Sequence, residues 1–535
     1  FINNKLDLGL NSKYWDIYLR PSLYTLITTF YERWLTISFL KKKYSIDKCI
    51  FINYNIENII SGDTEKLFKD IQSNDIFNQL IYQNILIFSG INFTKKDIEP
   101  AEITNSSSGN KILSLLGLYF KKLKIKNFIF LSKLILKQFK NYILLFSIKK
   151  KKFFYLTHYI GDKDLRKKFN LLFKQKNFIF KIKKIKKNIS LDLTFRNDLR
   201  NDFLFEKQND FEIFFKKEIF FILPKCFIEY LRFLKISNFN LCNNYKFNLG
   251  IISTDQVYNS NFFELDWIAK NYMNGSKLLL AQNGGGVLTS ECSTIKSLVK
   301  KLELKELVFG IEDNIKNKNY GVGFHRFKKK KNIFNRDGNI IYTLYSPYGY
   351  IGNMRSTVPL GSEWVEYISD HKRLISSLDN KIKNKIILRP KKRHSDYFYF
   401  KKELENQFPE IKMDNTYKPL GDMLKDSRLL ITTLDTTTVL EGLATNFPTI
   451  LICNFNHYKI ADEFLKYYEK LMDVGIIHNN INTAKKHIEN VFSDIDFWWN
   501  KNSTQLAREE FCKKIAYHPS KPNSFFMDKI LKMEI

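Results

Sequence analysis

The stretch RLLITTLDTTTVLEGLATNFPTILICN, residues 428–454, decides the fold. Its first apolar run, residues 429–433, predicts a β-strand, and the helical spacing of residues 439–445 predicts a helix that cannot continue through Pro448. A second apolar run, residues 449–453, predicts another strand. Strand, loop, helix and strand together form a βαβ unit, and such units build parallel sheets covered by helices.

The loop inside this unit places hydroxyl groups at the N-terminus of a helix. Asp435 is followed by Thr436, Thr437 and Thr438, and Asn446 is expected to end the helix. Ligands of open α/β sheets bind beyond the carboxyl ends of the strands, and the N–H groups of a helix N-terminus favour anions. The loop therefore predicts a phosphate site. Because threonine and aspartate are common helix caps, a purely structural cap is the alternative.

The same alternation of strands and helices occurs in two halves of the chain. In the first half, strands are predicted at 153–159, 247–254 and 277–281, with a helix at 262–273. In the second half, strands are predicted at 340–346, 385–389 and 476–477, and helices at 361–378, 398–407, 420–426, 461–472 and 483–492. The pattern predicts an α/β protein in which two Rossmann-like parallel-sheet domains face a cleft.

Composition shifts suggest where these domains begin and end. A segment rich in Lys, Asn and Gly, residues 316–339, predicts a linker. The predicted domains are an N-terminal α/β domain over 1–330 and a C-terminal α/β domain over 338–495. Residues 496–535 are expected to form a helical tail.

Two regions of the first half differ from this alternation. Tyr14, Trp15, Tyr18 and the apolar residues up to Trp34 recur at helical spacing around Pro21, which predicts two helices with a core-facing aromatic stripe. Residues 114–190 form a basic helical insertion in which apolar clusters alternate with lysines. The insertion fits an amphipathic surface for membrane contact or an ordinary solvated helix surface.

The charge of the chain admits several partners. It has 86 Lys and Arg against 55 Asp and Glu, a formal net charge of +31. The basic residues are mostly scattered lysines in a sequence rich in Asn, Ile and Phe, and no nucleic-acid motif is visible, so no nucleic-acid partner is expected. An anionic membrane surface stays open as a partner.

Cysteine usage and hydropathy address the location of the protein. The six cysteines form no close pair, which argues against a zinc site or a disulfide framework and fits a reducing compartment. No run approaches the roughly 18 apolar residues of a membrane-spanning helix. The prediction is a cytoplasmic protein that can lie peripherally at the inner face of the plasma membrane.

A glycine-rich loop follows the predicted strand 277–281. It consists of Gln282, Asn283, Gly284, Gly285 and Gly286. Successive glycines allow positive φ angles and close approach of the backbone to a ligand. The loop is neither a Walker loop nor a dinucleotide-binding fingerprint. Because it lies at the carboxyl end of a strand, it is expected to face the cleft opposite the threonine loop.

Several segments resemble a family of leptospiral-type transferases associated with bacterial O-antigen and surface-polysaccharide gene clusters. The resemblance is carried by NSKYWDIYLRPSL at 11–23, LPKCFIEYLRFL at 223–234, GSKLLLAQNGGG at 275–286, SRLLITTLDTTTVLEGLATNFPTI at 427–450, and residues 473–516. It implies a GT-B-like glycosyltransferase that moves a sugar from a nucleotide-sugar donor to a lipid-linked or polysaccharide acceptor. In such an enzyme the N-terminal domain, 1–330, would be the acceptor side and the C-terminal domain, 338–495, the donor-nucleotide side. In that family the glycine loop reads Gln-His-Gly-Gly. Here Asn283 replaces the His, and Asn does not titrate near neutral pH.

Glycosyl transfer needs stabilisation of the negative charge that develops on the leaving phosphate. On the donor side the expected ligands are Gln282, Gly284, Gly285, Gly286, Thr433, Asp435, Thr436, Thr437 and Thr438, with Arg389 and Lys391 as phosphate-neutralising cations. Glu441 could accept hydrogen bonds from a ribose, or it could be a first-turn acid favoured by the helix dipole. No Asp-x-Asp element suggests a metal, and no cofactor is expected besides the nucleotide-sugar substrate.

The acceptor hydroxyl needs a general base, and the sequence does not single one out. The candidates for the catalytic site are Asp255, His158 and Glu291, together with Asn283 in the glycine loop. Two further functions stay open. One is a phosphotransferase of the same fold that uses a CDP-alcohol. The other is a non-catalytic binding homologue, which the replacement at Asn283 makes credible.

Overall fold

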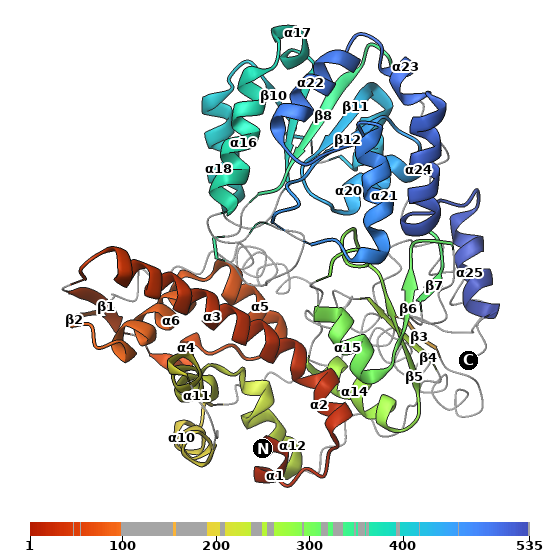
Figure 1. The fold of residues 1–535 in the computed structure, drawn as a ribbon. Helices are drawn as coiled ribbons and strands as arrows, with labels where there is room; N and C mark the ends of the chain where they lie inside the picture. Colours follow the sequence, from red (N-terminus) through yellow and green to blue (C-terminus); the bar gives the residue numbers. More distant parts are fainter. Residues whose placement is uncertain are drawn as a thin grey trace, which may run out of the picture.

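The computed structural model describes residues 1–46, 48–53, 55–97, 154–156, 190–203, 209–236, 249–253, 262–291, 294–311, 319–324, 335–346, 349–350, 359, 363–391, 396–416, 418–457 and 459–532. Two large parallel sheets, a two-stranded parallel sheet, a group of N-terminal helices and the C-terminal helices make up these parts of the chain (Figure 1). The predictions at His158, at Asp255 and over nearly all of the insertion 114–190 lie outside the described residues.

The sheet of the second half has six parallel strands in the order β10-β9-β8-β11-β12-β13. The strands are β8 (Asn339–Leu344), β9 (Ile386–Pro390), β10 (Lys412–Met413), β11 (Ser427–Thr432), β12 (Thr449–Ile452) and β13 (Ile477–His478). The chain first adds strands on one side of β8 and then continues from β11 on the other side. This is the Rossmann order, and it creates a topological switch point between β8 and β11.

Helices cover this sheet on both faces. They are α16 (Glu363–Ser377), α17 (Asn380–Lys383), α18 (Asp396–Gln407), α19 (Leu420–Met423), α20 (Thr437–Ala444), α21 (Asp462–Asp473) and α22 (Ile481–Val491). The strands and helices predicted for this half are confirmed within a few residues at each end, whereas the two-residue strand β10 was not predicted.

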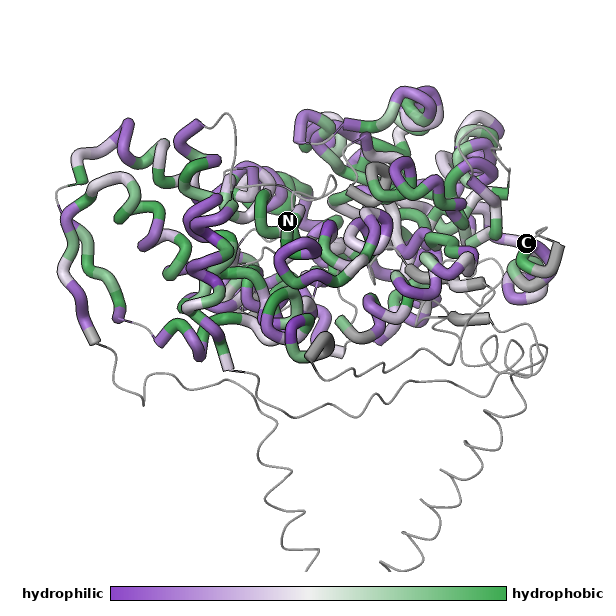
Figure 2. Tube along the Cα trace, turned by 90° about the horizontal axis from the view of Figure 1, so that it is seen from below, coloured by the Kyte–Doolittle hydropathy of each residue, from purple (hydrophilic) through white to green (hydrophobic). Residues whose placement is uncertain are grey.

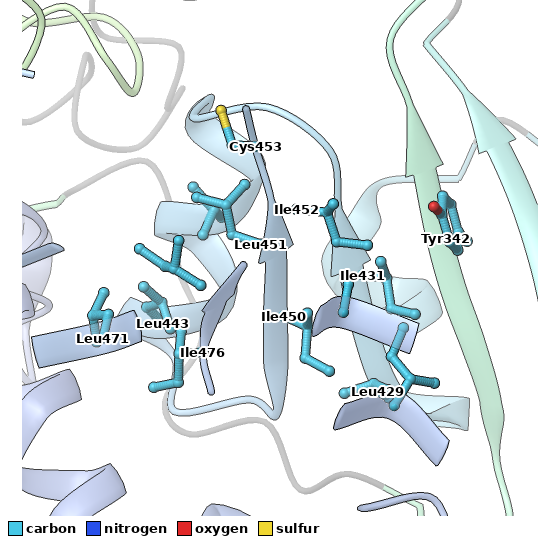
Figure 3. Close-up of a cluster of buried hydrophobic side chains, with 14 of the residues drawn as sticks. Tyr342, Leu429, Ile431, Leu443, Ile450, Leu451, Ile452, Cys453, Leu471 and Ile476 are labelled. Atoms are coloured by element: carbon cyan, nitrogen blue, oxygen red, sulfur yellow. The ribbon is translucent and has the colours of Figure 1, made fainter. Parts of the chain in front are cut away.

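The βαβ unit of residues 428–454 is confirmed as β11, α20 and β12. Ile431 of β11 pairs with Ile450 of β12. Asn446 ends α20 with a positive φ of 55°, and the N–H of Phe447 donates to the carbonyl of Gly442 at 2.9 Å. Figure 3 shows how the side chains of both strands pack with Leu443 of α20 in the buried core of this half.

The sheet of the first half has five parallel strands in chain order. They are β3 (Phe154–Leu156), β4 (Leu249–Ser253), β5 (Lys277–Ala281), β6 (Lys305–Val308) and β7 (Asn319–Gly321). Helices α14 (Phe262–Met273) and α15 (Thr294–Leu302) connect them, and the bounds predicted for β5 and α14 are confirmed. The described strands of this sheet follow one another without the reversal that creates a switch point.

The N-terminal helices form their own layer beside the first sheet (Figure 1). They are α1 (Ile2–Lys5), α2 (Ser12–Tyr18), α3 (Arg20–Lys43), α4 (Ile56–Ile59), α5 (Thr64–Ser73), α6 (Asp75–Phe88), α10 (Leu193–Asp202), α11 (Asp210–Ile222) and α12 (Glu229–Ile236), with the paired strands β1 (Cys49–Asn53) and β2 (Phe93–Asp97). The break near Pro21 is confirmed, because Pro21 lies in the first turn of α3.

The predicted core-facing stripe is wrong for part of α3. Leu26 and Phe30 are buried, but Ile27 and Tyr31 are 38% and 41% exposed. The apolar residues of α3 occupy both sides of the helix, so a single core-facing stripe cannot hold them all.

The C-terminal segment joins the two halves. It contains α23 (Ile495–Trp499), α24 (Asn502–Ile515) and α25 (Pro522–Lys532). Phe511 of α24 lies in the core of the second half. Beyond α24, the N–H of Tyr517 donates to the carbonyl of Phe309 at 2.9 Å, which returns the chain to the first half. No helix within the described ranges is long and apolar enough to cross a bilayer.

Candidate functional site at the switch point

A cavity of about 380 Å³ opens at the switch point of the second sheet. Four groups of residues line it. They are Thr343, Leu344 and Tyr345 at the end of β8; Arg389, Pro390 and Lys391 at the end of β9; Asp414 and Leu420 after β10; and Thr433, Leu434 and Thr436 of the β11–α20 loop with Thr438 and Glu441 of α20. Its size is that of a small-molecule site. Six of the predicted donor-side residues therefore meet at one cavity: Arg389, Lys391, Thr433, Thr436, Thr438 and Glu441.

The two cations of the cavity differ in their surroundings. Arg389 donates to Asp414 Oδ2 and to the carbonyl of Lys418, each at 2.8 Å, so a carboxylate already balances its charge. Lys391 is exposed, and its Nζ lies 4.6 Å from the centre of the Tyr345 ring. Within the described part of the chain, no carboxylate pairs with Lys391. The ammonium group of Lys391 is therefore available to an anionic ligand.

The N-terminus of α20 supplies the polar side of the cavity. Thr436 is the N-cap residue, but its side chain makes no capping hydrogen bond. The N–H groups of the first turn have no acceptor within the helix, and the helix dipole favours an anion beside them. Thr438 and Glu441 follow in the first turns of α20 and line the cavity. First-turn N–H groups of α20 that the Thr436 side chain does not cap therefore lie beside the cavity, whereas a purely structural cap would use the Thr436 hydroxyl.

The glycine loop contacts the threonine loop directly. The N–H of Gly285 donates to Thr437 Oγ1 at 3.4 Å. A Cβ on Gly285 would lie 2.4 Å from the carbonyl carbon of Thr436, and one on Gly284 would lie 2.9 Å from Thr437 Oγ1. Gly286 has a φ of +69°. The glycines thus permit close approach to the protein's own backbone, and they do not line the cavity.

The residues before the glycines are buried. Gln282 Oε1 accepts from the N–H of Phe309, and Gln282 Nε2 donates to the carbonyl of Gly284, each at 2.9 Å. The Gln282 side chain therefore braces the loop against the end of β6. Asn283 is 7% exposed. Neither side chain lines the switch-point cavity.

Asp435 of the threonine loop lies in a buried group that joins the two halves. Its Oδ2 accepts from the Tyr468 hydroxyl at 2.5 Å and from Thr289 Oγ1 at 3.2 Å. All three side chains are at most 1% exposed. Burial and the nearby Asp435 charge hold the pKa of Tyr468 well above its usual range, so the hydroxyl stays protonated and donates. The Asp435 carboxylate therefore bonds with side chains of the protein itself.

Glu291 and Thr433 also have structural partners. The Glu291 carboxylate pairs with Lys459 Nζ at 2.9 Å, and both groups are at least half exposed. The backbone of this loop pairs with the second half through the bridge between Ser290 and Ile460.

Thr433 Oγ1 donates to the carbonyl of Thr343 at 3.0 Å. Thr433 thus ties β11 to β8 at the floor of the cavity.

A smaller cavity of about 30 Å³ lies on the other side of Thr433 and Leu434. It has room for a water molecule. His371 and His457 line it. His371 Nδ1 shares a hydrogen bond of 2.8 Å with the Tyr342 hydroxyl, and burial lowers the pKa of His371 to about 3. His457 Nε2 lies 3.1 Å from Glu366 Oε2.

Sequence reasoning missed several residues of this region. Tyr345 and His457 follow the ends of β8 and β12, so the positions of the predicted strands could have pointed to them. Asp414 follows β10, which is too short to give a periodic pattern. Within the described residues, no group of three or more His, Cys, Asp or Glu side chains is placed to hold a metal ion.

The two Rossmann-like sheets, joined through loops at their carboxyl edges, form an α/β architecture of the GT-B kind. The chain belongs to the LIC12162 family of transferases, whose model matches residues 3–530. The family resemblance seen in the sequence is thereby confirmed at the level of a transferase.

Solved structures with a related fold are distant. MurG of Acinetobacter baumannii matches with 8% identity and a TM-score of 0.32, over 63% of this chain and 87% of that one. The calicheamicin glycosyltransferase CalG4 matches with 10% identity and a TM-score of 0.30, over 57% and 79%. The wall teichoic acid polymerase TagF matches with 11% identity and a TM-score of 0.28, over 54% and 74%. Likenesses at this level carry no argument about function. No curated protein matches the chain.

Proposed function

We propose that this transferase moves a sugar from a nucleotide-sugar donor, bound in the switch-point cavity, to a surface-polysaccharide intermediate. The observation that carries the proposal is the meeting of the α20 N-terminus and Lys391 at the carboxyl edge of the second sheet. Family membership supplies the transferase class. The donor and acceptor classes come from the sequence resemblance and are the part that needs testing.

The chemistry asked of the cavity is stabilisation of a leaving nucleotide phosphate. Negative charge grows on this phosphate as the glycosidic bond to the donor breaks. The first-turn N–H groups of α20, the hydroxyls of Thr436 and Thr438, and the ammonium of Lys391 can stabilise that charge without a metal ion. Glu441, one turn into α20, could accept hydrogen bonds from a ribose.

The proton of the acceptor hydroxyl must go to a base outside this donor cavity. Glu291 is paired with Lys459, and Asn283 does not titrate near neutral pH. Asp255 and His158 therefore stay as the predicted candidates for the general base. Asn283→His offers a direct check, because gain of turnover in that variant would support the reading of the present chain as a non-catalytic homologue.

The proposal is tested by calorimetric titration of the purified full chain with UDP-, GDP-, dTDP- and CMP-sugars and with CDP-glycerol. We expect one nucleotide-sugar class to bind. Lys391→Met should then weaken binding by roughly 10- to 100-fold, since a charge-assisted contact to phosphate is lost. Lys470→Met is the matched control, because Lys470 is an exposed lysine of α21 that does not line the cavity.

Three outcomes would count against the proposal. Binding of no nucleotide sugar would exclude a donor site, and unchanged affinity in Lys391→Met would move the site elsewhere. Binding of CDP-glycerol, followed by incorporation of its phosphate into product, would instead identify a CDP-alcohol phosphotransferase.

A further inference from the structure

Helix α3 is apolar on two opposite faces. Leu26, Phe30 and Ile37 are buried in the core of the N-terminal helices. The opposite face carries five exposed residues spaced three or four apart, here called the outer stripe: Tyr24, Ile27, Tyr31, Leu35 and Phe39. Such spacing places them along one side of the helix, where a surface helix normally carries polar residues. The outer stripe therefore needs an explanation other than the core.

The outer stripe leads to a further group of exposed apolar side chains. This group, here called the tip, consists of Tyr44 just after α3, Ile50 of β1, Ile87 of α6 and Phe93 of β2. Figure 1 places β1 and β2 at the far left end of the molecule, beside the end of α3. Ile50, at 67% exposed, belongs to a strand whose one partner among the described strands is β2. The tip thus lies at the end of the helix that carries the outer stripe.

The concentration of these residues is not a general feature of the composition. Of the fifteen large apolar side chains that are exposed within the described ranges, ten lie in residues 1–93. The second half, which is larger, has four: Val365, Leu465, Phe497 and Leu506. Figure 2 shows that apolar residues are common throughout the trace. A sequence rich in Ile and Phe would spread exposed residues evenly, so the surface has a local cause.

Positive charge accompanies the apolar surface. Lys41, Lys42 and Lys43 end α3, Lys48 precedes β1, and Lys95 and Lys96 lie in β2; all six are exposed. The one acidic residue of α3 is Glu32, which contacts the buried Arg33. We propose that the outer stripe and the tip dock the protein on an anionic lipid bilayer, with the apolar side chains entering the interface and the lysines beside the lipid phosphates.

Three physical features favour a bilayer over a protein partner. Lysine is depleted in protein–protein interfaces but is typical of helices that lie on anionic membranes. The tyrosines suit the headgroup level, where a ring can be apolar at one end and hydrated at the other. Tyr24 to Phe39 spans roughly 22 Å along the helix, enough for α3 to lie in the plane of the interface. This docking does not depend on the proposed transfer reaction.

The test is co-sedimentation of the full chain, without nucleotide, with sucrose-loaded vesicles. One set contains phosphatidylcholine alone and the other equal parts of phosphatidylcholine and phosphatidylglycerol. Binding is expected on the anionic vesicles. Leu35→Ser with Phe39→Ser should weaken it by about tenfold or more, since two apolar side chains no longer enter the interface. Lys42→Gln with Lys43→Gln should weaken binding to anionic vesicles by about tenfold or more.

The control pair is Leu506→Ser with Phe497→Ser. These residues are 51% and 67% exposed, close to the 47% and 63% of Leu35 and Phe39, and they lie on the second half. The control should bind vesicles like the parent protein. Unchanged binding in Leu35→Ser with Phe39→Ser would overturn the proposal and leave the basic insertion as the binding element. A parent dimer that this pair converts to monomer in sedimentation velocity would also overturn it, because the surface would then be an interface between two copies.

Discussion

The segments of residues 282–286 and 433–438 both follow parallel strands, one in each half, yet they make different contacts. The first is committed to the protein itself, because Gln282 braces β6 and Gly285 packs on Thr436. The second opens onto a cavity through Thr436 and Thr438. A glycine run thus marks close approach of a backbone, but the approaching group can be another loop as readily as a ligand.

The largest effect is expected where the two loops touch. Gly285→Ala would place a Cβ 2.4 Å from backbone atoms of Thr436, which cannot move aside like a side chain. We expect a loss of stability of about 3 kcal/mol, at the upper end of overpacking costs. Urea denaturation measures this loss. Gly62→Ala is the control, since a Cβ there meets nothing within 4 Å. If both variants unfold at the same urea concentration, the loops do not pack as described.

Acid distinguishes the two halves. Within the described residues, every histidine lies in the second half or the C-terminal segment. Burial lowers the pKa of His371 to about 3 from 6.5, so between these values the unfolded chain binds more protons than the folded one. The contribution of His371 to stability is therefore constant above about pH 6.5 and falls below it, by about 2 kcal/mol at about pH 5. In the first half, burial raises the pKa of Glu218, which gives the opposite sign.

Hydrogen exchange at pH 7 and pH 5 checks this contrast. Protection, after correction for the intrinsic exchange rate, should fall in the strands around His371 and persist in α11 around Glu218. His371→Gln should reduce the dependence on pH, because one of the groups that gain a proton on unfolding is removed. Part of the dependence should stay, since burial also lowers the pKa of His487 to about 4. Equal loss of protection in both halves would show that His371 is not the cause.

Much of the fold was predictable because its elements are long enough to show a period. The bounds of α14 and β5 follow from the sequence, and Asn446 ends α20 where expected. β10 has two residues and leaves no such pattern, so its neighbour Asp414, the partner of Arg389, could not be foreseen. The prediction that Ile27 faces the core was wrong for another reason. When a helix is apolar on both sides, its sequence does not reveal which side is buried.

The position of the candidate site at the edge of the sheet was predictable, but which of the predicted residues line the cavity was not. The positions of the strands place Arg389, Thr436 and Thr438 at one edge of the sheet, and they do line one cavity. Asp435 lies between the same strand and helix, yet it bonds with Tyr468. Which neighbour a side chain turns to depends on packing between segments far apart in the chain, and local sequence does not encode that packing.

The contact between Asp435 and Tyr468 gives an intermediate effect. We expect Asp435→Asn and Tyr468→Phe each to destabilise the protein, and the double variant to cost less than the sum of the two. The coupling energy should be about 1.5 kcal/mol, because Tyr468→Phe removes the hydrogen bond and Asp435→Asn removes the charge that strengthens it. Chemical denaturation of the four proteins measures it. Strictly additive losses would mean that the two side chains do not interact.

The smallest effect separates two adjacent threonines of the second loop. Thr437 accepts from Gly285 of the first loop, whereas Thr438 lines the cavity. Thr438→Val removes a hydroxyl from the proposed phosphate site, so the affinity for the bound nucleotide should fall by about fivefold, or about 1 kcal/mol. Thr437→Val should leave the affinity nearly unchanged, since its hydroxyl serves the contact between the loops. Titration calorimetry on both variants decides the matter, and Thr483→Val, in the first turn of α22, controls for the substitution itself. A larger loss at Thr437 than at Thr438 would place the ligand between the two loops, because the Gly285 amide and the Thr437 hydroxyl would then have to part to receive it.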